Sequence, residues 1–304
     1  MASGISVANA PCSYGAFELT VDDPNVAGPL AVLDGVAAAG YAGIDLGPAG
    51  YLGDAGALRS RLHERGLGLA GGYLALPFSS PRDLAAEMHQ LETLLDIFDS
   101  VPDTWPRPKP TLADTGSPER WSRPGAAARE PNLGWDDAGW RLFGEGIARV
   151  AERCRERGYE PTLHHHTGTH LEAVWEIDRA LQVSDVGLCL DTGHLLVGGG
   201  DPLAGIQAWA GRINHFHLKD ARREILDAIV AERAPMEAVW RRRAFCRLGE
   251  GDIDVKRVLD ELMVTKYSGW LVVEQDCMPD PAWPLENAVA DQVANRAYLN
   301  RLGI

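Results

Sequence analysis

The 304-residue chain has few cysteines, a deficit of positive charge and no long hydrophobic run. Its five cysteines are dispersed, odd in number and without a CxxC pair, which favours a reduced, cytoplasmic protein. No apolar run approaches the length that crosses a membrane, so no membrane partner is expected. The segment Met1–Ser6 lacks a basic region followed by an apolar core, and we therefore expect no signal peptide.

The charge balance is acidic. The chain has 29 Lys and Arg against 43 Asp and Glu, a net charge of -14 and a pI near 5.1. Duplex binding needs a basic surface, so this balance argues against a nucleic-acid partner. An anionic substrate is still possible, because a bound cation can make the electrostatic potential of a site positive in an acidic protein. The composition is that of a globular protein, and the length suits one α/β barrel or two smaller domains.

Short apolar runs alternate with longer amphipathic stretches along the chain. The eight candidate strands are Ile5–Ala8, Ala42–Leu46, Leu67–Tyr73, Pro110–Ala113, Pro161–His165, Gly187–Leu190, Ile213–His217 and Trp270–Glu274. The candidate helices that follow them are Pro29–Ala39, Asp54–Arg65, Pro81–Phe98, Gly139–Arg157, Thr169–Leu181, Pro202–Trp209, Val255–Lys266 and Asn287–Leu299. Pro near a start and Gly after an end match the usual asymmetry of helix termini.

Eight strand–helix units predict a parallel α/β fold, and the length suits a single (β/α)8 TIM barrel over residues 1–304. A doubly wound open sheet is the alternative, but no glycine-rich turn follows the first strand. Two insertions are expected, a loop at about 114–134 and a helical segment at about 221–247. The loop follows the fourth strand, where it is either a lid over the site or a surface loop.

Side chains that bind metals follow the last four candidate strands. Asp191, His217 and Glu274 end three of them, and four of the nine histidines lie within His164–His170. Barrel strands bring such residues together at their carboxyl ends. Mixed nitrogen and oxygen donors suit Mn²⁺, Co²⁺, Fe²⁺ or Zn²⁺ better than Ca²⁺.

The fourth ligand is expected from the histidine cluster. Its candidates are His164, His165 and His166. Alternation along the strand points His164 and His166 the same way and turns His165 outward toward the helices.

Several motifs in the chain resemble those of one known superfamily. They are His-His-Thr-Gly-Thr at 165–169, Asp-Thr-Gly-His at 191–194, His-Phe-His-Leu-Lys-Asp at 215–220, Arg-Leu-Gly-Glu-Gly at 247–251 and Gly-Trp-Leu-Val-Val-Glu-Gln-Asp at 269–276. The set resembles the xylose-isomerase-like TIM-barrel superfamily of sugar phosphate isomerases, epimerases and dehydratases. The likeness is greatest to its inosose (2-keto-myo-inositol) dehydratase branch, and it implies a divalent-metal barrel enzyme.

The resemblance also implies a ligand set. The superfamily usually binds its metal through Glu, Asp, His and Glu at the ends of strands five to eight. Asp191, His217 and Glu274 match the last three, and His164 takes the place of the first glutamate. Asp45 is a second departure, where relatives often carry glutamate. We expect one ion, Mn²⁺ first, with Co²⁺, Mg²⁺, Fe²⁺ or Zn²⁺ as alternatives.

The chemistry of dehydration indicates further site residues. A base must remove the proton next to the carbonyl, a cation must stabilise the enediolate, and an acid must protonate the departing hydroxyl. The candidates for acid and base are His166, His194, Lys219 and Glu18, with the two roles unassigned. The candidates for substrate contact are His215, Asp276 and Trp105.

Our first hypothesis is therefore a metal-dependent lyase of a keto-polyol or keto-sugar such as inosose. A ketose isomerase or epimerase is the alternative, and the loss of one glutamate counts against it because such epimerases use both as acid and base. Two further alternatives are an enzyme that cleaves a 3-keto-glycoside (C-glycoside) and a non-catalytic metal-binding subunit. An apurinic endonuclease shares the barrel, but the acidic charge opposes it. The expected partner is a small keto-sugar or keto-polyol, and homo-oligomerisation is left open.

Overall fold

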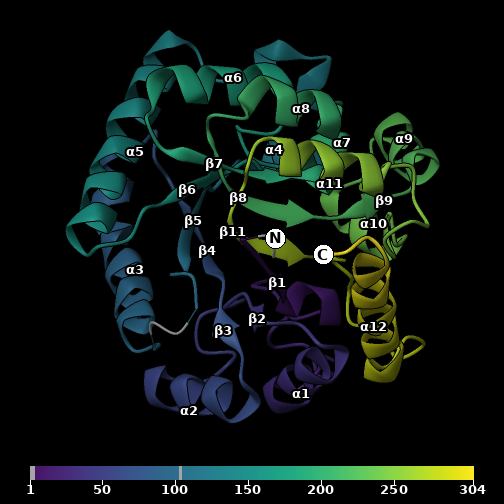
Figure 1. Ribbon diagram of the computed structural model, residues 1–304. Coiled ribbons are helices and arrows are strands. Elements are labelled where there is room, and N and C mark those ends of the chain that lie inside the picture. Colours follow the sequence, from purple (N-terminus) through teal and green to yellow (C-terminus); the bar gives the residue numbers. More distant parts are fainter. Residues whose placement is uncertain (1–3, 103–104) are drawn as a thin grey trace.

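The computed structural model describes residues 4–102 and 105–304. Met1–Ser3, in the segment for which no signal peptide was expected, lie outside the described residues. Parallel strands form a central barrel with helices outside it (Figure 1). The barrel strands are β1 Ile5–Asn9, β2 Gly43–Ile44, β3 Gly68–Leu69, β4 Gly71–Leu76, β5 Lys109–Asp114, β6 Thr162–His164, β7 Gly187–Asp191, β8 Ile213–Leu218 and β11 Gly269–Val273.

The nine segments correspond to eight barrel positions. The sheet order is β3-β2-β1-β11-β8-β7-β6-β5-β4, and Ala70 alone separates β3 from β4. β3 pairs with β2 and β4 pairs with β5, so this one interrupted strand joins the two edges. The predicted (β/α)8 barrel is therefore confirmed.

Eight helices pack around the barrel. They are α1 Pro29–Ala39, α2 Ala55–Arg65, α3 Pro81–Asp99, α5 Asp137–Glu156, α6 Val174–Val183, α8 Pro202–Trp209, α11 Val255–Val264 and α12 Leu285–Arg301. Four of them begin after an aspartate whose carboxylate accepts an N–H of the first turn: Asp54, Asp136, Asp201 and Asp254. Within residues 4–102 and 105–304, no helix is long and apolar enough to cross a membrane.

The barrel strands bury large apolar side chains toward the helices and small or polar ones inside. Leu112, Leu163 and Phe216 belong to the main apolar core. A separate inner cluster contains Ala8, Ala10, Ala70, Trp270 and Val272. The small residues leave interior space at the carboxyl ends of the strands, where polar side chains gather.

The start of α6 corrects the sequence prediction. The expected helix began at Thr169, but α6 begins at Val174. The Glu176 carboxylate accepts the N–H groups of Glu172 and Ala173, which caps the helix there. The preceding Gly168 has φ +85°, a conformation that ends regular structure and favours glycine.

The two insertions lie on the carboxyl side of the barrel and meet there. The first contains α4 Pro118–Ser122 and two short 3₁₀ helices, η2 Ala126–Ala128 and η3 Pro131–Leu133. The second contains β9 Asp220–Ala221, α9 Arg223–Glu232, α10 Met236–Arg241 and β10 Phe245–Cys246. Trp121 of α4 and Trp240 of α10 have ring centroids 6.2 Å apart, and Phe17 lies 4.9 Å from Trp240. The first insertion therefore forms part of the cover of the barrel end.

Candidate active site

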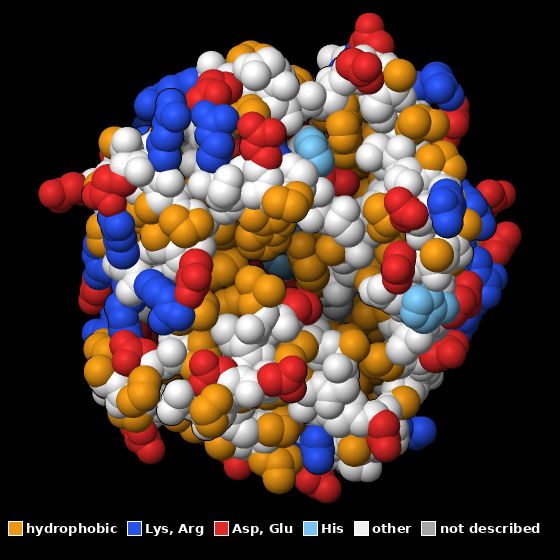
Figure 2. Space-filling view, turned by 180° about the vertical axis from the view of Figure 1, so that it is seen from behind, with side chains coloured by type: hydrophobic (Ala, Val, Ile, Leu, Met, Phe, Trp, Pro, Cys, Tyr) orange, Lys and Arg blue, Asp and Glu red, His pale blue; other side chains and the backbone are white. Residues whose placement is uncertain are grey.

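The carboxyl ends of the strands surround one cavity of about 240 Å³. Polar residues from six of the strand ends line it: Asp45, Tyr73, His164, His166, His194, His217, Lys219, Glu274 and Asp276. Apolar side chains line its outer part: Phe17, Leu19, Trp121 and Trp240. The space-filling view shows one face of the molecule hollowed at its centre, with hydrophobic side chains around the hollow (Figure 2).

Lys219 is the centre of the polar network. Its Nζ lies 2.7 Å from Asp191 Oδ2, 2.6 Å from Glu274 Oε2 and 3.4 Å from Asp276 Oδ2. Burial opposes the charge of this lysine, but the three carboxylates outweigh burial and raise its pKa well above the usual range. Lys219 is therefore an ammonium ion at neutral pH.

His217 and Glu274 form the second contact in this network. His217 Nδ1 lies 3.0 Å from Glu274 Oε2 and 3.7 Å from Asp191 Oδ2. Burial raises the pKa of Glu274, but His217 and Lys219 outweigh it and lower that pKa to about 2. Burial likewise raises the pKa of Asp191, and Lys219 and His194 hold it well below its usual value. Both carboxyl groups are ionised.

The site buries more negative than positive charge. Four carboxyl groups, of Asp45, Asp191, Glu274 and Asp276, are less than a tenth exposed and surround two basic groups, Lys219 and His217. Burial lowers the pKa of His217, but Cys189 and Glu274 raise it well above its usual value. Burial raises the pKa of Asp45 to about 7 and that of Asp276 to about 6, each lowered only partly by a nearby cation. Buried carboxylates without enough positive charge retain protons or bind a cation. The donor set therefore favours a divalent cation.

Two overlapping groups of ligand atoms could hold this cation. One comprises His164, Asp191 and His217, the other Asp45, His217 and Glu274, with the ligand atoms in each group within 4.8 Å of one another. His164 Nδ1, Asp45 Oδ1 and His217 Nε2 are buried and have no hydrogen-bond partner in the described structure, and His217 Nδ1 faces the Glu274 carboxylate at 3.0 Å. A set of nitrogen and oxygen donors that lack hydrogen-bond partners fits a divalent transition metal.

The other histidines of the cluster have distinct partners. His165 Nε2 accepts the backbone N–H of Asp191 at 3.0 Å, while His166 and His164 both line the cavity. His166 Nδ1 lies 2.7 Å from Thr167 O, and a carbonyl can only accept, so this nitrogen carries the proton. His170 Nδ1 lies 2.8 Å from Asp114 Oδ2, and its ring stacks on Trp135.

Burial keeps two of the cavity imidazoles, those of His166 and His194, neutral. It lowers the pKa of His166 to about 4, and Lys219 adds to the effect. It also lowers the pKa of His194 well below its usual value, helped by His166 and Lys219. His194 Nδ1 lies 2.9 Å from Thr167 Oγ1, and its Nε2 has no hydrogen-bond partner in residues 4–102 and 105–304. Both rings can accept a proton.

Of the remaining predicted residues, two line the cavity and two do not. Glu18 lines the cavity from an exposed position, and Asp276 reaches it beside Lys219. His215 and Trp105 do not line this cavity. His215 lies two residues before His217, deeper in the barrel, and Trp105 packs on Trp270 at the amino end of β11.

Sequence reasoning assigned no site role to three polar or thiol residues of the cavity, although it noted Asp45 as a departure from the relatives. Asp45 and Tyr73 follow or end the second and third strands, so the strand-end rule could have found both. Cys12 lies in the 3₁₀ helix η1 Pro11–Tyr14, and its Sγ is 3.7 Å from Glu274 Oε1. No motif marked this cysteine.

The xylose isomerase-like TIM barrel family model matches residues 33–296. The chain belongs to this family. The sequence of this family member is 29% identical over 274 residues to inosose dehydratase of Geobacillus kaustophilus, covering 89% of this chain and 86% of the relative. It is 35% identical over 253 residues to the rhizopine catabolism protein MocC of Rhizobium meliloti, and the match covers 82% of this chain and 75% of the relative.

Solved structures with the same fold are more distant. A probable 3-DHS dehydratase, AsbF of Bacillus anthracis, aligns with a TM-score of 0.68 at 14% identity over 97% of this chain and 98% of its own. The IOLI protein with a bound zinc atom aligns with a TM-score of 0.68 at 12% identity over 98% of each chain. At these identities the likeness shows the shared barrel of the family.

Proposed function

We propose that this xylose isomerase-like barrel is a divalent-metal-dependent dehydratase of a keto-polyol such as inosose. One observation carries the proposal. The neutral imidazole of His166 and the buried ammonium of Lys219 line the same cavity, next to an excess of carboxylates. The names of the relatives with high coverage, inosose dehydratase among them, support this substrate class.

The residues proposed to hold the metal are His164, Asp191, His217 and Glu274, with Asp45 as the additional oxygen donor next to His217. A divalent cation bound there, Mn²⁺ by our first preference, would supply Lewis-acid stabilisation of an enediolate oxygen. Until it gives up a proton, the Lys219 ammonium contributes a positive charge to the same end of the cavity.

We propose His166 as the base. Its Nδ1 proton is held by Thr167 O, so Nε2 carries the lone pair that accepts the proton next to the substrate carbonyl. Its lowered pKa keeps that nitrogen unprotonated at neutral pH. The C–H electron pair then forms the enediolate.

We propose Lys219 as the acid, with Glu18 at the exposed edge as a second candidate. The Lys219 ammonium can give one proton to the departing β-hydroxyl, which leaves as water while the carbon–carbon double bond forms. His194 stands beside His166, with ring centroids 3.9 Å apart, and can take up the abstracted proton or bind a hydroxyl. The apolar cover of Phe17, Trp121 and Trp240 excludes bulk water from the elimination.

The test is incubation of the Mn²⁺-loaded protein with a panel of inososes and 3-keto-glucosides. The proposal predicts loss of water from an inosose such as scyllo-inosose and a new enone-type absorbance. Inversion at one carbon with all hydroxyls retained would show an epimerase instead. Absence of any product across the panel would contradict the proposal.

A further inference from the structure

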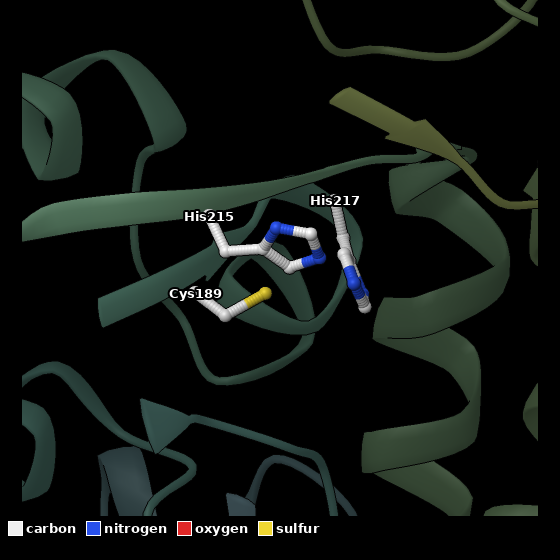
Figure 3. Close-up of side chains that lie close together, drawn as sticks. All are labelled: Cys189, His215 and His217. Carbon is white, nitrogen blue, oxygen red and sulfur yellow. The ribbon is translucent and has the colours of Figure 1, made fainter. Parts of the chain in front are cut away.

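A second group of metal-binding side chains lies beneath the proposed catalytic site. Cys189 of β7 and His215 of β8 are direct partners across the two strands, as are Asp191 and His217 two residues later. Cys189 and His215 therefore form one layer of the barrel interior, and Asp191 and His217 form the next layer toward the cavity. Figure 3 shows the Cys189 sulfur and the His215 ring pointing toward one another, with His217 beside them.

We propose that Cys189, His215 and His217 bind a thiophilic cation such as Zn²⁺. Their ligand atoms lie within 4.8 Å of one another, and the Cys189 and His215 side chains are 0% exposed. One sulfur and two imidazole nitrogens are the donors that zinc prefers, with bond lengths of about 2.3 Å and about 2.0 Å. Binding displaces the thiol proton of Cys189 to solvent.

The surroundings of His215 argue for a ligand. Neither of its ring nitrogens has a hydrogen-bond partner among the described residues, although the ring is fully buried. Leaving such a group unpaired destabilises the fold, and barrel interiors normally fill such positions with branched apolar residues. A bound ion satisfies the imidazole and explains a polar pair at this depth.

His217 belongs to both groups, and its ring has two nitrogens. Nδ1 lies 3.0 Å from Glu274 Oε2, on the side of the catalytic cavity. The His215 and His217 rings have centroids 5.2 Å apart. His217 Nε2 lies 3.7 Å from Asp45 Oδ2. A neutral imidazole has one lone pair, so His217 binds the lower ion through one nitrogen and can also join an upper ion only as an imidazolate, after its second proton has left to solvent.

A route to the lower layer comes from the opposite end of the barrel. A cavity of about 460 Å³ at the amino ends of the strands is lined by His215 together with Lys109 and Trp270. This entrance is separate from the catalytic cavity, whose lining does not include His215. Cys189 does not line this cavity, so His215 is the member of the group that a cation entering there would meet first.

The experiment is titration of the full chain with Co²⁺, because thiolate binding gives a near-ultraviolet charge-transfer band that nitrogen and oxygen ligands do not. The wild type should show the band. The Cys189→Ala variant should lose the charge-transfer band. It should also bind Zn²⁺ at this site about 100-fold more weakly or worse, a larger loss than removal of a residue that only supports a metal ligand would cause. Cys154→Ala, which removes a buried cysteine of α5, is the matched control and should keep the band.

Two further variants separate this proposal from the proposed function. Asp191→Asn should impair the upper site and keep the band, whereas His215→Phe should abolish the band. If His215 is only a packing residue, His215→Phe will leave the band unchanged, and that result would overturn the proposal. Absence of the band in the wild type, or its persistence in Cys189→Ala, would overturn it equally, whatever the activity toward inososes.

Discussion

Strands β7 and β8 present two successive pairs of side chains to the barrel interior, and the pairs differ in how their polarity is balanced. Asp191 and His217 meet charged groups on several sides, including Lys219 and Glu274. Cys189 and His215, one layer below, have no carboxylate or lysine in contact among the described residues, where the His215 nitrogens also lack hydrogen bonds. The upper layer is organised around charge and an open cavity, whereas the lower layer has uncharged donors enclosed by protein.

The comparison teaches where a cation is needed and which cation each layer favours. Four carboxylates around Lys219 and His217 favour a hard or borderline divalent ion, because oxygen donors dominate. A thiol with two imidazoles favours a softer ion. The two metal sites that we propose therefore lie two residues apart on the same two strands.

Glu274→Gln should have the largest effect, because it removes a negative charge from the upper layer. We expect the bound divalent metal to be lost and the dehydration rate to fall about 10³-fold or more, equivalent to several kcal/mol of transition-state stabilisation. Elemental analysis and kcat on an inosose would measure both. Full metal content with an unchanged rate would show that the upper layer is not the catalytic centre.

Lys219→Met tests the charge balance itself. It leaves Asp191, Glu274 and Asp276 without their shared cation. We expect the metal-free protein to lose about 3–5 kcal/mol of stability, the usual cost of breaking a buried ion pair. Urea denaturation in EDTA measures this loss, and an excess of Mn²⁺ should restore part of it. A stability equal to wild type would mean that the carboxylates do not depend on Lys219.

Acid should destabilise the fold through the buried histidines, and His165 is the clearest case. Burial lowers its pKa from 6.5 to about 4, so the unfolded chain takes up the proton first. Neutral His165 therefore contributes about 3 kcal/mol to the free energy of unfolding above pH 6.5, and this contribution is lost as the pH falls toward 4. Denaturation at pH 7 and pH 4.5 should show a larger loss for wild type than for His165→Gln, which retains an acceptor for the Asp191 N–H. Equal losses would contradict the assignment.

His166→Gln should slow the reaction without emptying the site. We expect kcat to fall about 10²-fold, within the range for loss of a general base, with metal content unchanged. His89→Gln changes an exposed histidine of α3 and is the matched control. A rate equal to that of the control would remove His166 from the mechanism.

Much of the upper layer could be predicted from sequence. Asp191, His217 and Glu274 end consecutive parallel strands, and closure of a barrel brings such ends together. His164 and His166 both line the cavity because side chains alternate along an extended chain. These conclusions need only periodicity and topology.

The remaining features depend on three-dimensional contacts. The reach of Lys219 to three carboxylates is a matter of side-chain geometry that no spacing encodes. α6 begins at Val174 rather than Thr169 because Glu176 caps it, a contact that the helical pattern of 169–181 does not reveal. Trp105 lies at the amino end of the barrel because it precedes β5, and its aromatic character alone does not reveal this position.

The most direct test of the central claim is an inosose dehydration assay on protein stripped of metal with EDTA and then supplied with one equivalent of Mn²⁺. We predict no enone formation before the addition and turnover after it, with Glu274→Gln inactive in both conditions. Equal product formation with and without the ion, or none in either, would contradict the account.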